Sequence, residues 1–431
     1  MPRLASITSQ TLAGIGITRT SIPTWSLAHT LDDPNTFGTS DSDSFGDAVA
    51  ISGNYAIVSA RTEESNSGLN ASGKTFIYDV TTGNLVHDLD NPNAFNFQTG
   101  DVFGEAVAID GNYAIVSAIV EDDAGGVSSG KAYIFNVTTG SLVHTLDNPN
   151  AYGTSADDRF GKAVGISGNY AIVSTRDEDD AGGTRSGKAY IFNVTTGSLV
   201  HTLDNPNAYG TSLDDRFGHS AAISGNYAIV GAPFEDDANG NSSGKAYIFD
   251  VTTGNLLHTL DNPNPYGGPA IGSDDLFGWS VGISGNNAIV GAYNEDEPAG
   301  FNSGKAYIFD VTTGNLLHTL NNPNAYNTVS DDVFGISVAI SSTYAIVGAQ
   351  GEDDAGGTQS GKAYIFDVAT GSLVDTLDNP NAYGTSGSDI FGEAVAISGT
   401  NIIVGALLED DAPGGTGNGN LAGKAYIFTA S

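Results

Sequence analysis

Seven copies of one unit fill most of this chain of 431 residues. Each copy opens with a Phe-Gly pair, and successive pairs lie 57 to 60 residues apart. The phenylalanines of these pairs are Phe45, Phe103, Phe160, Phe217, Phe277, Phe334 and Phe391. Self-similarity at one period indicates a repeat architecture. It overrides the two or three ordinary domains that the length alone would suggest.

Four short β-type runs, separated by turn residues, make up each unit: FGxAVxIS, YAIVGA or YAIVSA, KAYIFDV, and LVHTL. No window shows a sustained apolar period of 3.6 residues, so we expect almost no helix. In the first run Phe45, Val49 and Ile51 point to one side, and the small Ala48 and Ala50 point to the other. Sheets with one large and one small face can interdigitate. The pattern therefore predicts an all-β fold, a seven-bladed β-propeller with four antiparallel strands per blade.

The two ends of the repeat array predict how the ring closes. The last unit stops after its third run, at Lys424–Ser431, whereas an extra fourth run, Ser26–Leu31, precedes the first unit. We expect this N-terminal strand to complete the last blade in a three-plus-one closure. The predicted domains are an arm at residues 1–24, which packs on the propeller or on a neighbouring chain, and a propeller at residues 25–431.

Composition narrows the possible partners and locations. The chain has 15 Lys and Arg against 50 Asp and Glu, a formal net charge of −35, which argues against binding to nucleic acid or to anionic membranes. It has no Cys, which excludes disulfides, Cys-ligated zinc and thiol catalysis. No apolar stretch is long enough to span a membrane. The first residues lack the apolar segment of a secretory signal, so we expect no signal peptide.

The loops of the repeat predict two unlike faces. Antiparallel strands place the long, acid-rich loops at one end of every blade and the tight SGNY-type and VTTGN-type turns at the other. We therefore expect one strongly acidic face and a nearly neutral opposite face. The Asp or Asn before each VTTG-type turn is expected to bond back to the turn backbone.

An acidic motif, Glu-Asp-Asp in most units, occupies the loop after the second run. It could bind calcium weakly or form a solvated acidic rim, and we favour the rim because packed like charges usually stay hydrated. We expect no other cofactor. The weak calcium candidates are Asp122, Asp123, Asp179, Asp180, Asp236, Asp237, Asp353, Asp354, Asp410 and Asp411.

Two other residue types recur once per unit. A lysine opens every third run and is expected to neutralise part of the acidic loop. A histidine stands in nearly every fourth run, where Asp375 replaces it once. The propeller would hold these histidines well apart, so we do not expect them to ligate a metal.

The positions at which the copies differ are the candidate binding positions. They flank the Phe-Gly pair and follow the second run, so they should surround the mouth of the central channel on the acidic face. A constant frame with variable side chains on one face is typical of repeat proteins that bind partners, although unconstrained drift would also vary these positions. The candidate partner-binding residues are Arg61, Ile119, Arg176, Phe234, Tyr293, Leu407, Leu408, Trp279, His219 and Lys162.

The Phe-Gly starts, the VGAP segment at Val230 to Pro233 and the seven units near 57 residues resemble the FG-GAP repeat family. That family forms the seven-bladed propeller of integrin α heads. The motifs EDDAGG, SGKAYIF and HTLDNPNAYG are similar to repeats encoded by bacteria and by marine cyanobacterial phages. The family's calcium hairpin is of DxDxDG type, and here it is only SGN, DGN, SST or SGT, so that metal site is not expected.

The resemblance implies adhesion, recognition or assembly rather than catalysis, and no residue set fills the roles of nucleophile, base and stabiliser. We expect a non-enzymatic module of a phage virion, located on the virion surface or outside the cell. Its arm would hold other virion proteins and its acidic face would meet a host-surface glycan or protein. The alternative is a secreted bacterial adhesin or a lectin-like, glycan-binding propeller.

Overall fold

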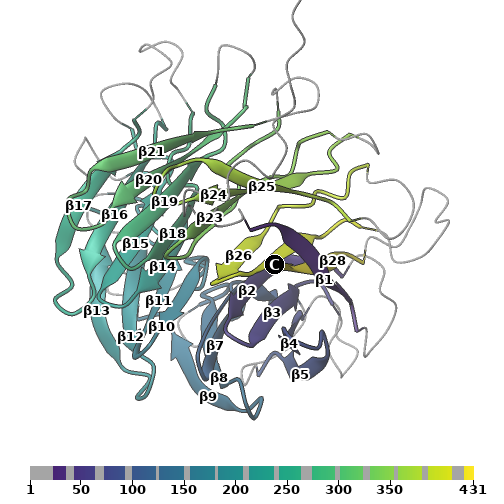
Figure 1. The fold of residues 1–431 in the computed structure, drawn as a ribbon. Coiled ribbons are helices and arrows are strands. Elements are labelled where there is room, and N and C mark those ends of the chain that lie inside the picture. Colours follow the sequence, from purple (N-terminus) through teal and green to yellow (C-terminus); the bar gives the residue numbers. More distant parts are fainter. Residues whose placement is uncertain are drawn as a thin grey trace, which may run out of the picture.

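The computed structural model describes residues 23–34, 43–63, 72–92, 100–122, 126–149, 156–179, 183–206, 213–236, 242–263, 274–296, 301–323, 331–353, 358–380, 387–409 and 422–431. Within these ranges the secondary structure consists of strands β1 to β28, without helices, so no helix could cross a membrane. The strands form seven separate four-stranded antiparallel sheets arranged around a centre (Figure 1). The fold is the all-β, seven-bladed propeller that the repeats predict.

The four strands of each blade are called A to D from the innermost outward. Blade 1 is β2 (Phe45–Ser52), β3 (Tyr55–Ala60), β4 (Lys74–Asp79) and β5 (Leu85–Asp90). Blade 2 is β6 (Phe103–Asp110), β7 (Tyr113–Ala118), β8 (Lys131–Asn136) and β9 (Leu142–Asp147). Blade 3 is β10 (Val164–Ser167), β11 (Tyr170–Thr175), β12 (Lys188–Asn193) and β13 (Leu199–Asp204). Blade 4 is β14 (Ser220–Ser224), β15 (Tyr227–Ala232), β16 (Lys245–Asp250) and β17 (Leu256–Asp261).

The remaining blades follow the same order. Blade 5 is β18 (Ser280–Ser284), β19 (Asn287–Ala292), β20 (Lys305–Asp310) and β21 (Leu316–Asn321). Blade 6 is β22 (Val338–Ile340), β23 (Tyr344–Ala349), β24 (Lys362–Asp367) and β25 (Leu373–Asp378). Blade 7 is β26 (Val395–Ser398), β27 (Asn401–Ala406) and β28 (Lys424–Ala430), with β1 (Trp25–Asp32) as its strand D.

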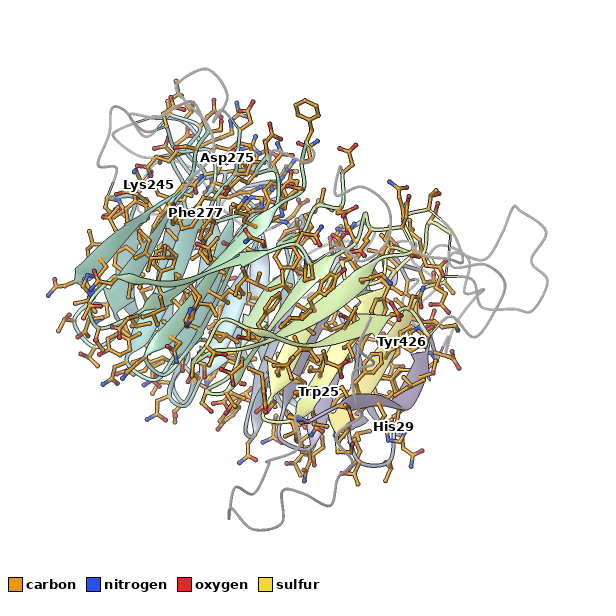
Figure 2. All side chains as sticks on the ribbon, turned by 45° about the horizontal axis from the view of Figure 1, so that its top comes forward. Trp25, His29, Lys245, Asp275, Phe277 and Tyr426 are labelled. Atoms are coloured by element: carbon orange, nitrogen blue, oxygen red, sulfur yellow. The ribbon has the colours of Figure 1, made fainter. Side chains whose placement is uncertain are left out.

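Blade 7 joins the two ends of the propeller. Strand β1 pairs antiparallel with β28, from Trp25 opposite Ala430 to Asp32 opposite Lys424. Trp25 is buried, its indole Nε1 donates to the Thr400 carbonyl oxygen at 3.0 Å, and its ring meets Tyr344 edge-on. Figure 2 shows Trp25, His29 and Tyr426 in this part of the ring. The arm at residues 1–22 lies outside the described residues.

Strand A is shorter than its sequence pattern in most blades. In β2 the register shifts between Phe45 and Val49, and in blades 3 to 7 the strand begins only after the Phe-Gly pair. The glycine of the pair leaves the extended conformation of a strand, with a φ of +91° at Gly46 and +102° at Gly161. A Cβ at Gly46 would also lie 2.3 Å from the Lys424 carbonyl oxygen in blade 7, so only glycine allows this approach of two blades.

The core lies between blades. One cluster combines Ile57, Ile77 and Leu89 of blade 1 with Phe103 and Ile109 of blade 2. Ala50, from the small face of strand A in blade 1, packs against the same cluster. The large face of each blade therefore fills the space beside the small face of its neighbour, as the alternation of strand A predicts.

Histidines on strand D connect neighbouring blades. His29, His87, His144, His258 and His318 each place Nε2 3.0 to 3.2 Å from a carbonyl oxygen in the C–D turn of the next blade. Asp375 replaces the histidine in blade 6, next to blade 7, whose strands C and D are the two ends of the propeller chain. There the Asp375 carboxylate accepts from the backbone N–H of Trp25 at 2.8 Å.

The end of the propeller with the tight turns is not neutral, so the expectation of a nearly neutral face is wrong. Asp79 accepts from the backbone N–H of Thr81 and Thr82, as the turn chemistry predicts, and Asp250 and Asp310 do the same in their turns. These hydrogen bonds lower the pKa of the three carboxyls, which are therefore charged at neutral pH. The carboxylates placed at this end by strand direction are Asp79, Asp110, Asp250, Asp310 and Asp367. Within the described ranges no Lys or Arg lies there.

Candidate functional site

The residue after each Phe-Gly pair points into the central channel. These seven residues differ strongly in chemistry, and together they line one cavity of about 350 Å³ with the two residues that follow each of them. We call them the channel ring: Asp47, Glu105, Lys162, His219, Trp279, Ile336 and Glu393. This variable position of the repeat therefore meets its six counterparts at one place, as the repeat predicts for the mouth of the channel.

Charged residues occupy one part of the channel ring. Arg61 lies between two carboxylates, with Nε 3.2 Å from Asp47 and Nη1 3.0 Å from Glu105. The Lys162 ammonium is 2.7 Å from Glu105. Burial alone would raise the pKa of Glu105, but the charges of Lys162 and Arg61 lower it. This part of the ring is a closed network of ion pairs.

Glu393 stands outside that network. Burial and the nearby Asp47 raise its pKa to about 7. Burial likewise raises the pKa of Asp47 to about 6, although Arg61 opposes the shift. The acidic side of the ring therefore changes its charge near neutral pH.

Aromatic residues occupy the other part of the ring. The rings of His219 and Trp279 are 4.2 Å apart, Tyr293 meets Trp279 at 4.8 Å, and Phe234 lies 6.3 Å from Trp279. His219 is buried, and its Nδ1 has no hydrogen-bond partner among the described residues. Burial and the charges of Lys162, Arg176 and Arg216 hold its pKa well below the usual range. His219 is therefore neutral and belongs to an apolar, aromatic surface.

The other candidate partner-binding residues differ in their burial and in their contacts with the channel ring. Arg61, Phe234 and Tyr293 contact ring residues directly. Arg176 is half-buried and lies 3.5 Å from Asp177. Leu407 and Leu408 are half-buried at the exit of β27.

Ile119 departs from the expected position. Its side chain is only 9% exposed, so it offers little surface to a partner.

The glutamate of the acidic motif is not part of a solvated rim, so the favoured interpretation is wrong for this residue. Glu121 is fully buried at the exit of strand B, and its carboxylate accepts from the Tyr133 hydroxyl at 2.6 and 2.7 Å. Burial raises the pKa of Glu121 to about 7. Tyrosine partners also hold the glutamates of blades 3 to 7: Glu178, Glu235, Glu295, Glu352 and Glu409.

Blade 1 provides an internal comparison for this contact. Phe76 stands at the position of Tyr133, opposite the valine of strand B. Glu63 has no hydrogen-bond partner on either carboxylate oxygen among the described residues, and burial raises its pKa to about 9. Unit 1 keeps the glutamate as Glu63 but has KTFIY in place of KAYIF, so the two residues are not lost together and the sequence alone gave no signal for their pairing.

The second acid of the motif stabilises its own loop. Asp122 accepts from the Ser128 backbone N–H at 2.9 Å, and the corresponding acids Asp179, Asp236 and Asp353 accept in the same way. No group of three His, Asp or Glu suited to a metal occurs in the described ranges. The remaining calcium candidates, Asp123, Asp180, Asp237, Asp354, Asp410 and Asp411, lie outside those ranges. Weak calcium binding stays a prediction.

The lysine that opens strand C has a different principal partner from the one expected. Lys131, Lys188, Lys245 and Lys362 are buried, and each pairs with the aspartate that ends strand D. In blade 5 that position is Asn321, and there the Lys305 ammonium lies 3.5 Å from the buried Glu295. Figure 2 shows Lys245, Asp275 and Phe277 near one another at this end.

Comparison with protein families identifies the repeat. The family model described as FG-GAP repeat matches residues 38–78, 94–135, 150–192, 208–249, 271–309, 324–366 and 381–428. The matched segments cover more than half of the chain.

The chain belongs to the FG-GAP repeat family. Each FG-GAP segment ends in strand C, so strand D of every blade falls outside the matched segments. This agrees with a ring whose last FG-GAP unit takes its strand D from the N-terminal end. Comparison with curated proteins finds no match to the chain. A propeller of FG-GAP repeats is an interaction or structural module.

Proposed function

We propose that this propeller is a non-enzymatic module that binds a partner at the mouth of its central channel. The observation that carries the proposal is the channel ring, because acidic, basic, aromatic and aliphatic side chains on nearly identical backbones converge on one cavity. Variable side chains on a constant frame are how repeat proteins build binding surfaces. The aromatic part, Trp279, Tyr293 and Phe234, offers the large and rigid contacts that dominate binding energy at interfaces.

The absence of catalysis is part of the proposal. The carboxyl groups with raised pKa values at the strand ends recur in most blades and are held by tyrosines. This supports a structural role for them, whereas catalysis requires one positioned set of groups.

We place the module on a phage virion, where it would decorate the particle or contact the host surface. The support is the similarity of the EDDAGG, SGKAYIF and HTLDNPNAYG motifs to repeats of phages and bacteria. A particle module should co-purify with virions through a density gradient. Recovery of the chain only in the culture medium, free of particles, would favour the secreted adhesin instead.

The channel mouth can be tested with its own tryptophan. The chain has two Trp, and Trp25→Phe leaves Trp279 as the single reporter. A bound partner should shift the emission of Trp279 and protect it from acrylamide. Quenching that is unchanged at saturating partner would contradict binding at the mouth.

A photo-cross-linking residue gives a second test. It would be placed at Ile336, in the channel ring, and at Asn255, an exposed turn residue at the opposite end. We expect cross-links to another protein or glycan mainly from position 336. Equal yields from the two positions would contradict the proposed surface.

A further inference from the structure

The arginines of this acidic propeller are concentrated at one place. Seven of its eight lysines open a strand C, and the eighth, Lys162, is bound to Glu105. Of the five arginines in the described ranges, Arg61 belongs to the network of the channel ring. The other four lie on blade 3 and at its borders with blades 2 and 4, and we call them the arginine sector: Arg159, Arg176, Arg185 and Arg216.

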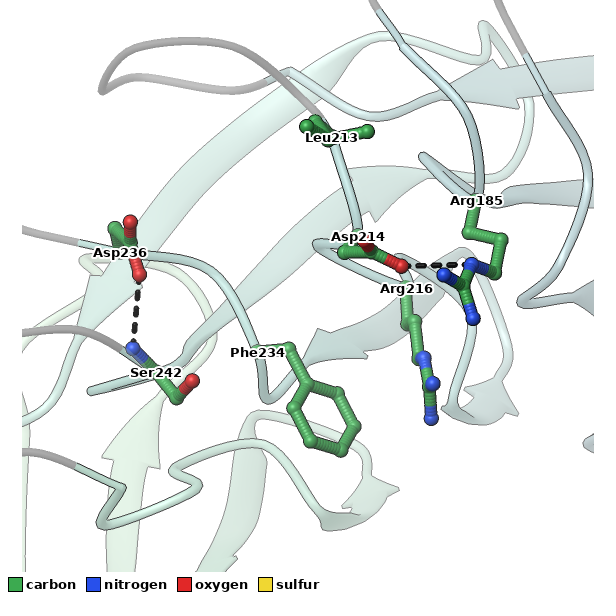
Figure 3. Close-up of a pocket in the computed structure, with 7 residues that line it drawn as sticks. All are labelled: Arg185, Leu213, Asp214, Arg216, Phe234, Asp236 and Ser242. Carbon is green, nitrogen blue, oxygen red and sulfur yellow. Dashed lines mark hydrogen bonds and ion pairs between the residues drawn. The ribbon is translucent and has the colours of Figure 1, made fainter.

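A pocket opens within the arginine sector. Its volume is about 420 Å³, and it is lined by Arg185, Leu213, Asp214, Arg216, Phe234, Asp236 and Ser242. In Figure 3 the two arginines lie on one side, Asp236 and Ser242 on the other, and the ring of Phe234 between them. We propose that this pocket binds an anionic saccharide, that is, a sugar that carries a carboxylate or sulfate group.

Arg216 is the cation available to a ligand. Its guanidinium lies 4.6 Å from the centre of the Phe234 ring, and it has no ion pair among the described residues. Arg185, by contrast, holds Asp214 at 2.7 Å. Burial and the charge of Arg176 lower the pKa of Arg216, so cations are crowded here at an energetic cost. An anion bound beside Arg216 would relieve that repulsion.

The remaining lining favours a sugar over an acidic peptide. The carboxylates of Asp214 and Asp236 can only accept hydrogen bonds, so they suit the hydroxyl donors of a sugar and would repel further acidic side chains. Phe234 and the exposed Leu213 add apolar surface for the C–H groups of a sugar ring. The volume is within the usual range for small-molecule sites and exceeds what a single carboxylate side chain needs.

The inference deepens the proposed function, because it names a ligand class on the face that carries the channel mouth. Phe234 takes part in both sites, so it is not used in the test. The neighbouring repeats provide substitutions that the backbone already accepts. Arg216 has a φ of 53°, and Leu276 occupies the same position in blade 5 with a φ of 59°. Ser242 of blade 4 likewise occupies the position of Arg185 in blade 3, and their φ values are 48° and 52°.

The experiment is a calorimetric titration of the full chain with polygalacturonate, dextran sulfate and uncharged dextran at about 0.15 M salt, where charges more than about 8 Å apart are screened. We expect one or both anionic polymers to bind and dextran not to bind. Arg216→Leu and Arg185→Ser should weaken binding about tenfold or more, as expected for lost hydrogen bonds to a charged group. The matched control is Arg159→Val, which removes the same charge from the arginine sector but outside the pocket, at the position of Val102.

Three results would overturn the inference. The first is no binding of either anionic polymer. The second is an equal loss of affinity in Arg159→Val, which would mean that the polymer is attracted by the charge of the whole arginine sector and is not bound in the pocket. The third is binding of poly-glutamate as tightly as of the polysaccharides. An unchanged Trp279 emission during saccharide binding would separate this pocket from the channel mouth, so the two proposals can fail independently.

Discussion

A carboxyl group buried beside a tyrosine recurs at the exit of strand B. In blade 2 the pair is Glu121 and Tyr133, and in blade 3 it is Glu178 and Tyr190. A charged carboxylate loses its hydration in such a place, so its protonated form is favoured in the folded state. The pKa is raised to about 7 for Glu121, Glu178, Glu295 and Glu352.

Stability should therefore fall as the pH rises from about 5 to 8. The folded pKa lies above the usual value of 4.5, so the folded state keeps a proton that the unfolded chain has already lost, and this advantage disappears above pH 7. Each such carboxyl contributes up to about 3 kcal/mol at the acidic end of this window. Glu121→Gln keeps an acceptor for Tyr133 without a charge. It should raise the melting temperature at pH 8 and flatten the pH dependence, as followed by calorimetry between pH 5 and 8. An unchanged slope would show that Glu121 does not titrate in this range.

Strand D carries the contact that sets each blade against the next. The His87 ring lies against the C–D turn of blade 2, with Nε2 3.1 Å from the Thr138 carbonyl oxygen. Gly140 completes that turn with a φ of +69°, and a Cβ there would lie 2.8 Å from His87 Nδ1. The turn is thus shaped by the neighbouring blade as well as by its own backbone.

Substitution of two glycines separates the cost of the left-handed backbone from the cost of disturbing the contact between blades. Gly111, in the A–B turn of blade 2, has a φ of +55° and nothing within 4 Å of its Cβ position. Gly111→Ala should cost only the left-handed backbone penalty, about 1–2 kcal/mol. Gly140→Ala should cost at least about 1 kcal/mol more in urea unfolding, because it also displaces His87. Equal costs would mean that the contact between the blades is unimportant.

Strand β1 is the element that closes the ring. Its buried Trp25 and Leu31 belong to two different core clusters, one shared with blade 6 and one shared with blade 1. Deleting residues 25–32 should lower the stability by several kcal/mol, since loss of one buried tryptophan side chain alone costs about 3–5 kcal/mol. Thermal unfolding measures the change.

A circular permutant provides the control for that deletion. A VTTGN-type turn would join β28 to β1, and new ends would open at a surface turn elsewhere. Ser431 N–H already lies 3.0 Å from the Thr24 carbonyl oxygen, so the join needs little movement. The permutant should keep the melting temperature of the parent. A deletion variant that melts like the parent would contradict the role of β1.

At the scale of the whole molecule, charge is distributed unevenly. The turn end carries carboxylates such as Asp79, Asp110 and Asp367 without a Lys or Arg among the described residues. All 13 described cations stand at the loop end, and most are already paired with acids. A net charge of −35 therefore acts mainly as self-repulsion.

Added salt should accordingly stabilise the propeller. The melting temperature should rise between 10 mM and 0.5 M NaCl, because the screening length falls from about 30 Å to a few ångströms. Sucrose at equal osmolality serves as the uncharged control. A melting temperature that falls with salt would show that the ion pairs of the loop end outweigh the repulsion.

The sequence alone determined the ring. Period-two alternation and tight turns are local signals, and seven repeats with a displaced fourth strand leave few alternatives to a seven-bladed propeller. The position of the channel ring followed from the same repeat, since equivalent positions must meet on the axis.

The burial and the partners of the polar residues depended on contacts between distant parts of the chain. Whether Glu121 is solvated or buried depends on Tyr133, and the role of Asp375 depends on Trp25, which lies 350 residues away. The arginine pocket likewise exists only because blades 3 and 4 bring Arg185 and Arg216 together. Burial and charge pairing are properties of three-dimensional packing, and for that reason only the tertiary structure decided them.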